Sequence, residues 1–255
     1  MSEVSNLVEF AEQIVREAGE FTKGFFRKSL DIQSKSDNSP VTQADLGAEQ
    51  LVRQRIERVY PSHGIIGEEF GQKHPTDQSP YTWVLDPIDG TKSFIRGIPL
   101  YTTLLAVLEH EEPIIGIIFN PILDEFTLGV KGLPTLFNNK EVQVSKTSTL
   151  SEAWLQITDP TDLLHRQPEG GLKLMNSVLA TRTWADGHGY ALVARGEADI
   201  MVDPIMNLWD LACLQPIIQG AGGILTDIHG SAGLGTSAIA ANPLLHRQVL
   251  ELFKN

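Results

Sequence analysis

The chain has 255 residues, enough for one large domain or two closely joined subdomains with a sizeable core. Apolar residues make up 42% of it and charged residues 20%, which excludes a disordered or fibrous chain. With a formal net charge of −12, we do not expect general electrostatic binding to the phosphate backbone of a nucleic acid. The single cysteine excludes an internal disulfide framework and a multi-cysteine zinc site.

The amino terminus lacks the pattern of a signal peptide, because no basic segment precedes an unbroken apolar stretch. No apolar run in the sequence is long enough to cross a membrane. We therefore expect a cytoplasmic, soluble protein that uses neither a membrane nor a nucleic acid as its partner.

The first half of the sequence predicts two helices followed by strands. Apolar residues recur at helical spacing over residues 4–29, and a polar stretch at 33–40 reads as a loop. A second helix is expected to begin near Thr42, where Asp45 forms a weak capping box, and to end at Pro61. The strands expected next, close enough for an antiparallel sheet packed on both helices, are 83–85, 100–108, 113–119 and 125–130.

The second half alternates between strand and helix patterns, which favours an α/β fold class. We expect one folded unit with an N-terminal subdomain over residues 1–145 and a C-terminal α/β subdomain over residues 146–255. The expected strands are 153–157, 174–179, 198–202, 223–225 and 237–240, and the expected helices are 187–195, 209–219 and 243–253.

Three acidic motifs stand out: Gly67-Glu68-Glu69, Asp86-Pro87-Ile88-Asp89-Gly90-Thr91 and Trp209-Asp210. In the second motif an apolar strand stops at Asp86, and proline takes the chain out of the sheet, so that Asp89 can fold back toward Asp86. The N–H groups after Gly90 could then face a phosphate, and Mg²⁺ commonly joins carboxylates to a phosphate. Each motif alone is also typical of a turn, a solvated loop or a helix cap.

Taken together and in this order, with Lys92-Ser93-Phe94 and Gly222-Gly223, the motifs resemble those of the inositol monophosphatase family over nearly the whole chain. The resemblance implies a layered α/β/α/β/α sandwich. It also implies a homodimer that hydrolyses a phosphate monoester by in-line attack of a metal-activated water, with two or three Mg²⁺ in each active site. Cys213 departs from the family pattern of Gly, Ala or Ser, but it is small and apolar and should change packing little.

The resemblance further implies roles for single residues. The implied metal ligands are Glu68, Asp86, Asp89, Asp210 and the backbone carbonyl of Ile88. The implied catalytic residues are Thr91, which orients the water, its acidic partner Asp45, and Glu69, which lies near the metals. The N–H groups of Gly90 and Thr91 are implied to bind phosphate, while Lys35 lies either on a loop over the site or in solvent.

Elementary chemistry agrees with this ligand set. Carboxylates brought close together raise one another's pKa unless cations neutralise them. An all-oxygen set without a Cys/His cluster favours Mg²⁺ over Zn²⁺.

The substrate side, from Arg182 to Tyr190 and from Asp199 to Pro204, looks more like the histidinol-phosphate phosphatases of this family than its inositol enzymes. Asp186 and Asp203 would place two carboxylates beside the cationic groups of histidinol phosphate, although Asp186 can also cap a helix and Asp203 can serve a polyol. Arg182 and His188 are either substrate contacts or structural residues.

Two other functions stay open. The first is hydrolysis of inositol 1-phosphate or a related polyol or sugar phosphate. The second is a regulatory role as a binding partner of the transcription machinery. The complete acidic set favours retained catalysis over a purely regulatory role.

Overall fold

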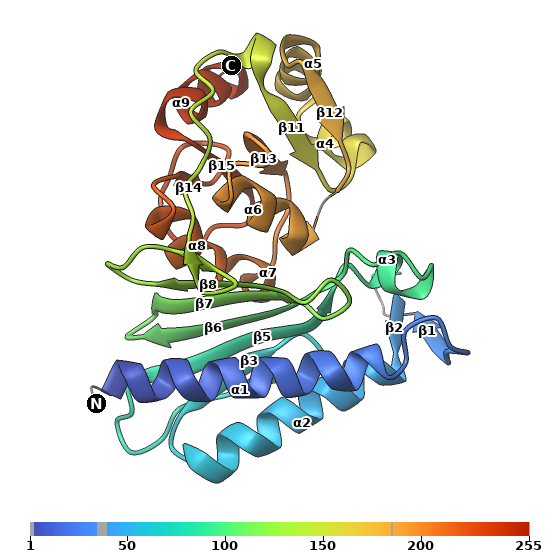
Figure 1. Ribbon diagram of the computed structural model, residues 1–255, viewed down its shortest axis with the longest axis vertical. Helices are drawn as coiled ribbons and strands as arrows, with labels where there is room; N and C mark the ends of the chain where they lie inside the picture. Colours follow the sequence, from blue (N-terminus) through green and yellow to red (C-terminus); the bar gives the residue numbers. More distant parts are fainter. Residues whose placement is uncertain (1–2, 35–39, 185, 255) are drawn as a thin grey trace.

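The computed structural model describes residues 3–34, 40–184 and 186–254. Five layers follow one another along its long axis: two helices, a large sheet, a second group of helices, a smaller sheet and an outer group of helices (Figure 1). This is the layered α/β/α/β/α sandwich that the family resemblance implied.

The first two layers are built by the N-terminal part of the chain. Helices α1 (Glu3–Lys23) and α2 (Gln43–Val59) cover one face of an eight-stranded sheet of order β10-β9-β8-β7-β6-β5-β3-β4. All neighbouring strands are antiparallel except β3 and β5, which are parallel. The strands are β3 (Gly64–Gly67), β4 (Gly71–Lys73), β5 (Tyr81–Asp89), β6 (Thr102–Glu109), β7 (Glu112–Asn120), β8 (Glu125–Val130), β9 (Leu136–Phe137) and β10 (Lys140–Glu141).

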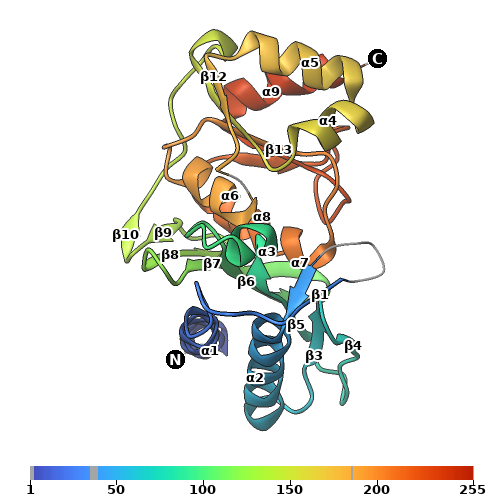
Figure 2. The same cartoon turned by 90° about the vertical axis from the view of Figure 1, so that its right-hand side faces the viewer.

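The middle layer packs against the other face of this sheet. It contains α6 (Asp186–Ala194), α7 (Leu208–Leu211) and α8 (Leu214–Gly220), seen between the two sheets in both views (Figure 2). Gly116 of β7 and Gly129 of β8 let the backbone of this layer approach the sheet, because a Cβ at either position would overlap Cys213 or Ile217 backbone atoms.

A test of this close approach is Gly116→Ala. We expect a loss of about 2–4 kcal/mol of unfolding free energy, because the new methyl overlaps the buried carbonyl of Cys213 and the backbone must move. Urea unfolding measures it. The control, Glu112→Ala on the same strand, is exposed and should change stability by no more than about 0.5 kcal/mol.

The remaining layers belong to the C-terminal part. The five-stranded sheet has the order β12-β11-β13-β15-β14, with parallel pairs of β11 with β12 and β13 and antiparallel pairs of β15 with β13 and β14. Its strands are β11 (Trp154–Ile157), β12 (Ala180–Arg182), β13 (Ile200–Asp203), β14 (Ile224–Thr226) and β15 (Ala238–Ala241). The outer helices are α4 (Pro160–Arg166), α5 (Pro168–Ser177) and α9 (Pro243–Phe253).

Four short elements complete the described part of the chain. A small hairpin of β1 (Ile32–Ser34) and β2 (Pro40–Thr42) precedes α2, and the short helix α3 (Thr91–Ile95) follows β5. A 3₁₀ turn (Leu150–Glu152) leads into β11.

Most predicted elements are confirmed, and the differences have local causes. The strand predicted at 174–179 is wrong, because α5 runs to Ser177 and buries Leu174; a short apolar run suits a buried helix as well as a strand. The helix predicted at 209–219 is two helices, α7 and α8, and α4 was not predicted. The first helix ends at Lys23, earlier than predicted, and short strands flank the predicted loop.

The predicted boundary at residue 145 falls between the last strand of the large sheet and the first strand of the small one. As a statement about two subdomains it stays a prediction. In the described ranges, no helix is long and apolar enough to span a membrane.

Candidate active site

The end of β5 and the start of α7 bring three buried or half-buried carboxylates together. Oxygen atoms of Asp86, Asp89 and Asp210 all lie within 4.8 Å of one another. The register of β5 against β6 shifts between Asp86 and Asp89, which turns both side chains to the same side of the strand end. An all-oxygen cluster of this size can hold a hard divalent cation.

Backbone and hydroxyl donors fix the two aspartates of β5. The Ile88 N–H donates to Asp86 Oδ1 at 2.9 Å, while Thr102 Oγ1 donates to Asp89 Oδ2 at 3.0 Å. The Gly187 N–H, at the start of α6, also donates to Asp89 Oδ2. The carboxylates are therefore oriented before any ligand binds.

Asp210 is held by a capping box at the start of α7. Its Oδ2 accepts the Asn207 N–H at 3.0 Å and the Asn207 side-chain amide at 3.3 Å. The helix-cap interpretation and the metal-ligand prediction for Asp210 are thus compatible. Oδ2 accepts the bonds of the cap, and Oδ1 is the second carboxylate oxygen that a cation could use.

Glu68 follows β3 and lies close enough to influence the cluster. Burial raises the pKa of Asp86 well above its usual range, and the negative charge of Glu68 raises it further, followed by those of Asp89 and Asp210. Burial also raises the pKa of Asp210 to about 6, and Glu68 again contributes. Such mutual repulsion is relieved when a cation binds between the carboxylates.

The predicted water-orienting pair lies beside this cluster. The Thr91 hydroxyl donates to the carbonyl of Ile88 at 3.0 Å, which leaves that oxygen a second lone pair for a cation. Asp45 is buried and its Oδ2 accepts both the N–H and the hydroxyl of Thr42, so it completes the capping box of α2. Burial raises the pKa of Asp45, and Glu68 is among the charges that raise it.

The start of α2 packs directly on the strand end that carries the aspartates. Ala44 shares a buried cluster with Ile88, Phe94 and Tyr101. This packing brings Asp45 to the site, while its partnership with Thr91 stays a prediction.

A small cavity of about 120 Å³ opens beside Asp89 and Asp210. Asp186 lines it, and burial raises the pKa of this carboxyl to about 7, with Asp203 and Asp210 as further causes. The lining residues are Asp89, Leu104, Thr158, Asp159, Asp162, Asp186, Gly187, Tyr190, Asp203, Pro204, Ile205, Met206 and Asp210.

The other predicted substrate residues lie differently. Asp203 also lines the cavity, but its oxygens accept the Tyr190 hydroxyl at 2.9 Å and the Thr158 N–H at 3.3 Å. Arg182, on the edge strand β12, is exposed and stacks over Trp154 with its guanidinium carbon 5.2 Å from the ring centre. Its role as a substrate contact stays a prediction that the cavity lining does not support.

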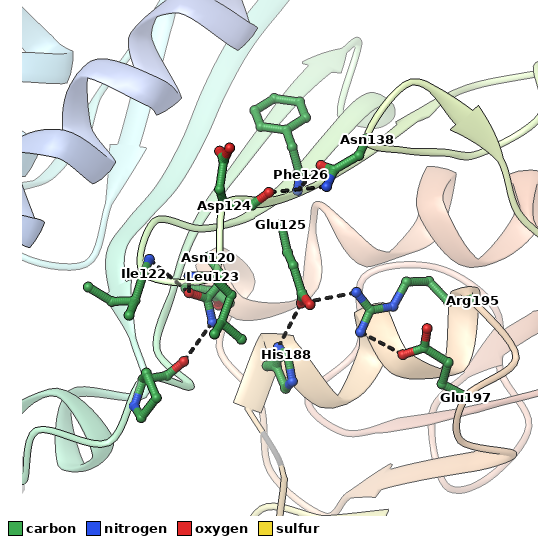
Figure 3. A network of polar contacts seen from close by, with 12 residues as sticks. Asn120, Ile122, Leu123, Asp124, Glu125, Phe126, Asn138, His188, Arg195 and Glu197 are labelled. Carbon is green, nitrogen blue, oxygen red and sulfur yellow. Dashed lines mark hydrogen bonds and ion pairs between the residues drawn. The ribbon is translucent and has the colours of Figure 1, made fainter.

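Helix α6 and the residues just after it are anchored to the large sheet by charged side chains, of which Arg195 is buried (Figure 3). Glu125 of β8 pairs with Arg195 at 3.0 Å and approaches His188 Nδ1 at 3.8 Å, while Arg195 also pairs with Glu197 at 2.8 Å. The network fixes the helix whose first turn reaches Asp89, and it favours a structural role for His188.

The sequence analysis did not predict Asp159 and Asp162 in the cavity lining, and it did not predict the buried Glu49, which bonds to the turn after Glu68. Asp159 caps α4 with its Oδ1, and Asp162 pairs with Arg166 at 3.0 Å. The available signal for Glu49 was its place four residues after Asp45, on the same face of α2. Lys35 lies outside the described residues.

Comparison with known proteins agrees with this geometry. Residues 3–255 match the model of the inositol monophosphatase family. The histidinol-phosphatase of Chlorobaculum parvum is 35% identical over 97% of this chain and 96% of its own length, and the Nus factor SuhB of Pasteurella multocida is 28% identical over 96% and 94%. A solved inositol monophosphatase from Zymomonas mobilis superposes with a TM-score of 0.88 and 34% identity, covering 99% of each chain.

The fold and the acidic cavity thus define a phosphatase, an enzyme that hydrolyses phosphoric monoesters. The chain belongs to the inositol monophosphatase family, whose members depend on metal ions.

Proposed function

We propose that this phosphatase acts on histidinol phosphate and uses Mg²⁺. One observation carries the choice of substrate: six aspartates line the cavity, and none of the described residues lining it is Lys, Arg or His. A cavity of that charge suits an ester whose organic part is cationic. Histidinol phosphate has an ammonium group and an imidazole, whereas inositol phosphate has only neutral hydroxyls beyond its phosphate.

The donor set supports Mg²⁺. The residues that would hold the cations are Asp86, Asp89 and Asp210, with Glu68 and the Ile88 carbonyl beside them. Bound Mg²⁺ would neutralise the phosphate and lower the pKa of a water for attack. The protein's own part is to orient these oxygens through the donors of Thr102, Gly187 and Asn207.

The position of Asp186 supports an amino group close to the phosphate. Gly90 has φ = 84°, and a Cβ placed on it would lie only 3.0 Å from Asp186 Oδ2. The Asp186 carboxylate therefore borders the turn that is expected to bind phosphate. In histidinol phosphate the ammonium-bearing carbon is bonded to the ester carbon, so a phosphate at Gly90 would place the ammonium beside Asp186.

The deciding experiment compares kcat/KM for histidinol phosphate and myo-inositol 1-phosphate with Mg²⁺, using Asp89→Asn as the blank. We expect a preference for histidinol phosphate of about a hundredfold or more, some 2.7 kcal/mol. A preference for the inositol ester would overturn the substrate proposal and leave the metal proposal standing. The homologue named inositol monophosphatase is the reason for choosing that competitor.

Metal binding should also be linked to pH. In the folded protein the pKa is about 6 for Asp210 and about 7 for Asp186, and both values exceed the pKa of an unfolded Asp. Without metal, the free energy of unfolding therefore falls as the pH rises from about 4 to about 7, because these buried groups lose their protons. Bound Mg²⁺ would displace the proton of Asp210, a predicted ligand, and its positive charge would lower the pKa of the neighbouring Asp186. The gain in melting temperature on replacing EDTA by Mg²⁺ should therefore grow between about pH 5 and pH 8, by about 3 °C or more.

Differential scanning fluorimetry in both media measures this gain. Histidines whose pKa is lowered by burial, such as His63 and His246, affect both curves equally and cancel in the difference. The same gain at pH 5 and pH 8 would contradict proton displacement, and Asp89→Asn should show little gain at either pH.

A binding role toward the transcription machinery stays a prediction, supported only by the relative named as a Nus factor. The homodimer also stays a prediction, which light scattering of the purified protein would test.

A further inference from the structure

We infer that Glu49 is a positioning residue of the metal site: its buried carboxylate holds the turn that presents Glu68 to the aspartates. The inference rests on the proposed metal site but not on the proposed substrate. It concerns the turn between β3 and β4, which contains residues 68–70.

Glu49 is fully buried, and its carboxylate bonds to this turn and to one arginine. Its Oε2 accepts the Glu69 N–H at 2.8 Å, and its Oε1 accepts the Phe70 N–H at 3.0 Å. Arg53, one helical turn later, donates its Nε to Oε1 at 2.8 Å and reaches the carbonyl of Gly71 with Nη2. Two successive backbone donors and one guanidinium thus converge on a single carboxylate.

The chain makes room for this carboxylate. A Cβ on Gly67 would overlap Glu49 Oε1, so the last residue of β3 must be glycine if the acid is to stand behind the strand. Phe70 is half exposed, yet its N–H bonds to a buried group. A solvent-facing turn tied inward in this way is held in one conformation.

The held turn carries a predicted metal ligand. The Glu68 N–H donates to the carbonyl of Leu85 on β5 at 3.4 Å, and the Glu68 charge raises the pKa of Asp86 on the same strand. Asp45, one turn before Glu49 on α2, is influenced by Glu68 as well. Helix α2 therefore supports the site at two successive turns, with Asp45 at its edge and Glu49 behind it.

Glu49→Gln tests this role, since it keeps the shape but sets an amide donor against an N–H of the turn or the guanidinium of Arg53. Groups that orient metal ligands typically change metal affinity by about 10–100-fold, so we expect Mg²⁺ to bind at least about tenfold more weakly. Isothermal titration calorimetry measures binding directly, and the Mg²⁺ concentration for half-maximal activity should rise in parallel. Hydrogen exchange at the Glu69 and Phe70 amides should become faster.

The matched control is Glu57→Gln, the same change on the same helix at an exposed residue that pairs with Lys73 at 3.6 Å. Its Mg²⁺ affinity should equal that of the wild type. Arg53→Lys keeps the positive charge but loses the fork that joins Glu49 to Gly71, and should weaken Mg²⁺ binding by about threefold. If Glu49→Gln does not fold, the Mg²⁺ affinity of Arg53→Lys tests the inference in its place.

Folded Glu49→Gln with wild-type Mg²⁺ affinity and a lower melting temperature alone would show a purely structural residue and overturn the inference. So would unchanged affinity in Arg53→Lys if Glu49→Gln fails to fold. Failure of the wild type itself to bind Mg²⁺ would instead contradict the metal site of the proposed function. The preference between the two phosphate esters should be the same in Glu49→Gln and the wild type.

Discussion

Asp89→Asn is expected to leave the protein folded and to lower kcat at saturating Mg²⁺ by about a thousandfold or more. Asp89 is a member of the three-carboxylate cluster, and no neutral amide can replace its charge toward a cation. The amide can keep its oxygen toward Thr102 and Gly187, which are the contacts that hold the side chain in place. The loss should therefore fall on the chemistry rather than on the fold.

The stability of this variant separates the two effects further. Burial raises the pKa of Asp89 well above its usual range, and the charges of Asp186 and Asp210 raise it more. Removal of an unfavourable buried charge should leave the melting temperature in EDTA unchanged or higher. Thermal unfolding and phosphate release measure the two quantities.

Asp124→Asn is the control, because Asp124 is exposed and pairs only loosely with Arg16 at 3.7 Å. It should retain wild-type turnover. Turnover of Asp89→Asn within tenfold of the wild type at saturating Mg²⁺ would remove Asp89 from the metal site.

Local sequence signals predicted the parts of this site that one segment builds. The prediction that the strand stops at Asp86 is wrong, because β5 runs through Pro87 to Asp89; the register shift between Asp86 and Asp89 still lets both carboxylates share the strand end. The capping box of Thr42 and Asp45 likewise marked the start of α2. These signals are readable because they depend on residues only a few positions apart.

The remaining parts depend on contacts between distant segments. Asp210 reads locally as a helix-cap residue, and only the family resemblance joined it to Asp86. In the sequence, Glu49 looks like an ordinary acidic residue of a helix, because the N–H groups that it binds lie in the distant turn between β3 and β4. Leu174 was assigned to a strand because an apolar run does not reveal whether a helix or a sheet will cover it.

Asp186→Asn should change which ester the enzyme prefers. The Asp186 carboxylate borders Gly90, and the Asp186 N–H is held by the Thr158 hydroxyl at 3.1 Å, so the side chain can meet an ammonium next to a bound phosphate. Loss of a charge pair in a partly desolvated pocket costs about 2–3 kcal/mol, and kcat/KM for histidinol phosphate should fall about 30–100-fold. Turnover of an ester whose organic part is uncharged, such as myo-inositol 1-phosphate, should fall less than about threefold.

Asp203→Asn is the informative comparison, because both oxygens of Asp203 are already bonded to Tyr190 and Thr158. Its loss disturbs the cavity wall, so both esters should suffer to a similar degree and the melting temperature should drop. Asp186→Glu, which keeps the charge on a longer side chain, should restore part of the preference for histidinol phosphate. Equal losses on both esters in Asp186→Asn, without rescue by Glu, would show that Asp186 shapes the cavity but does not read the substrate's charge.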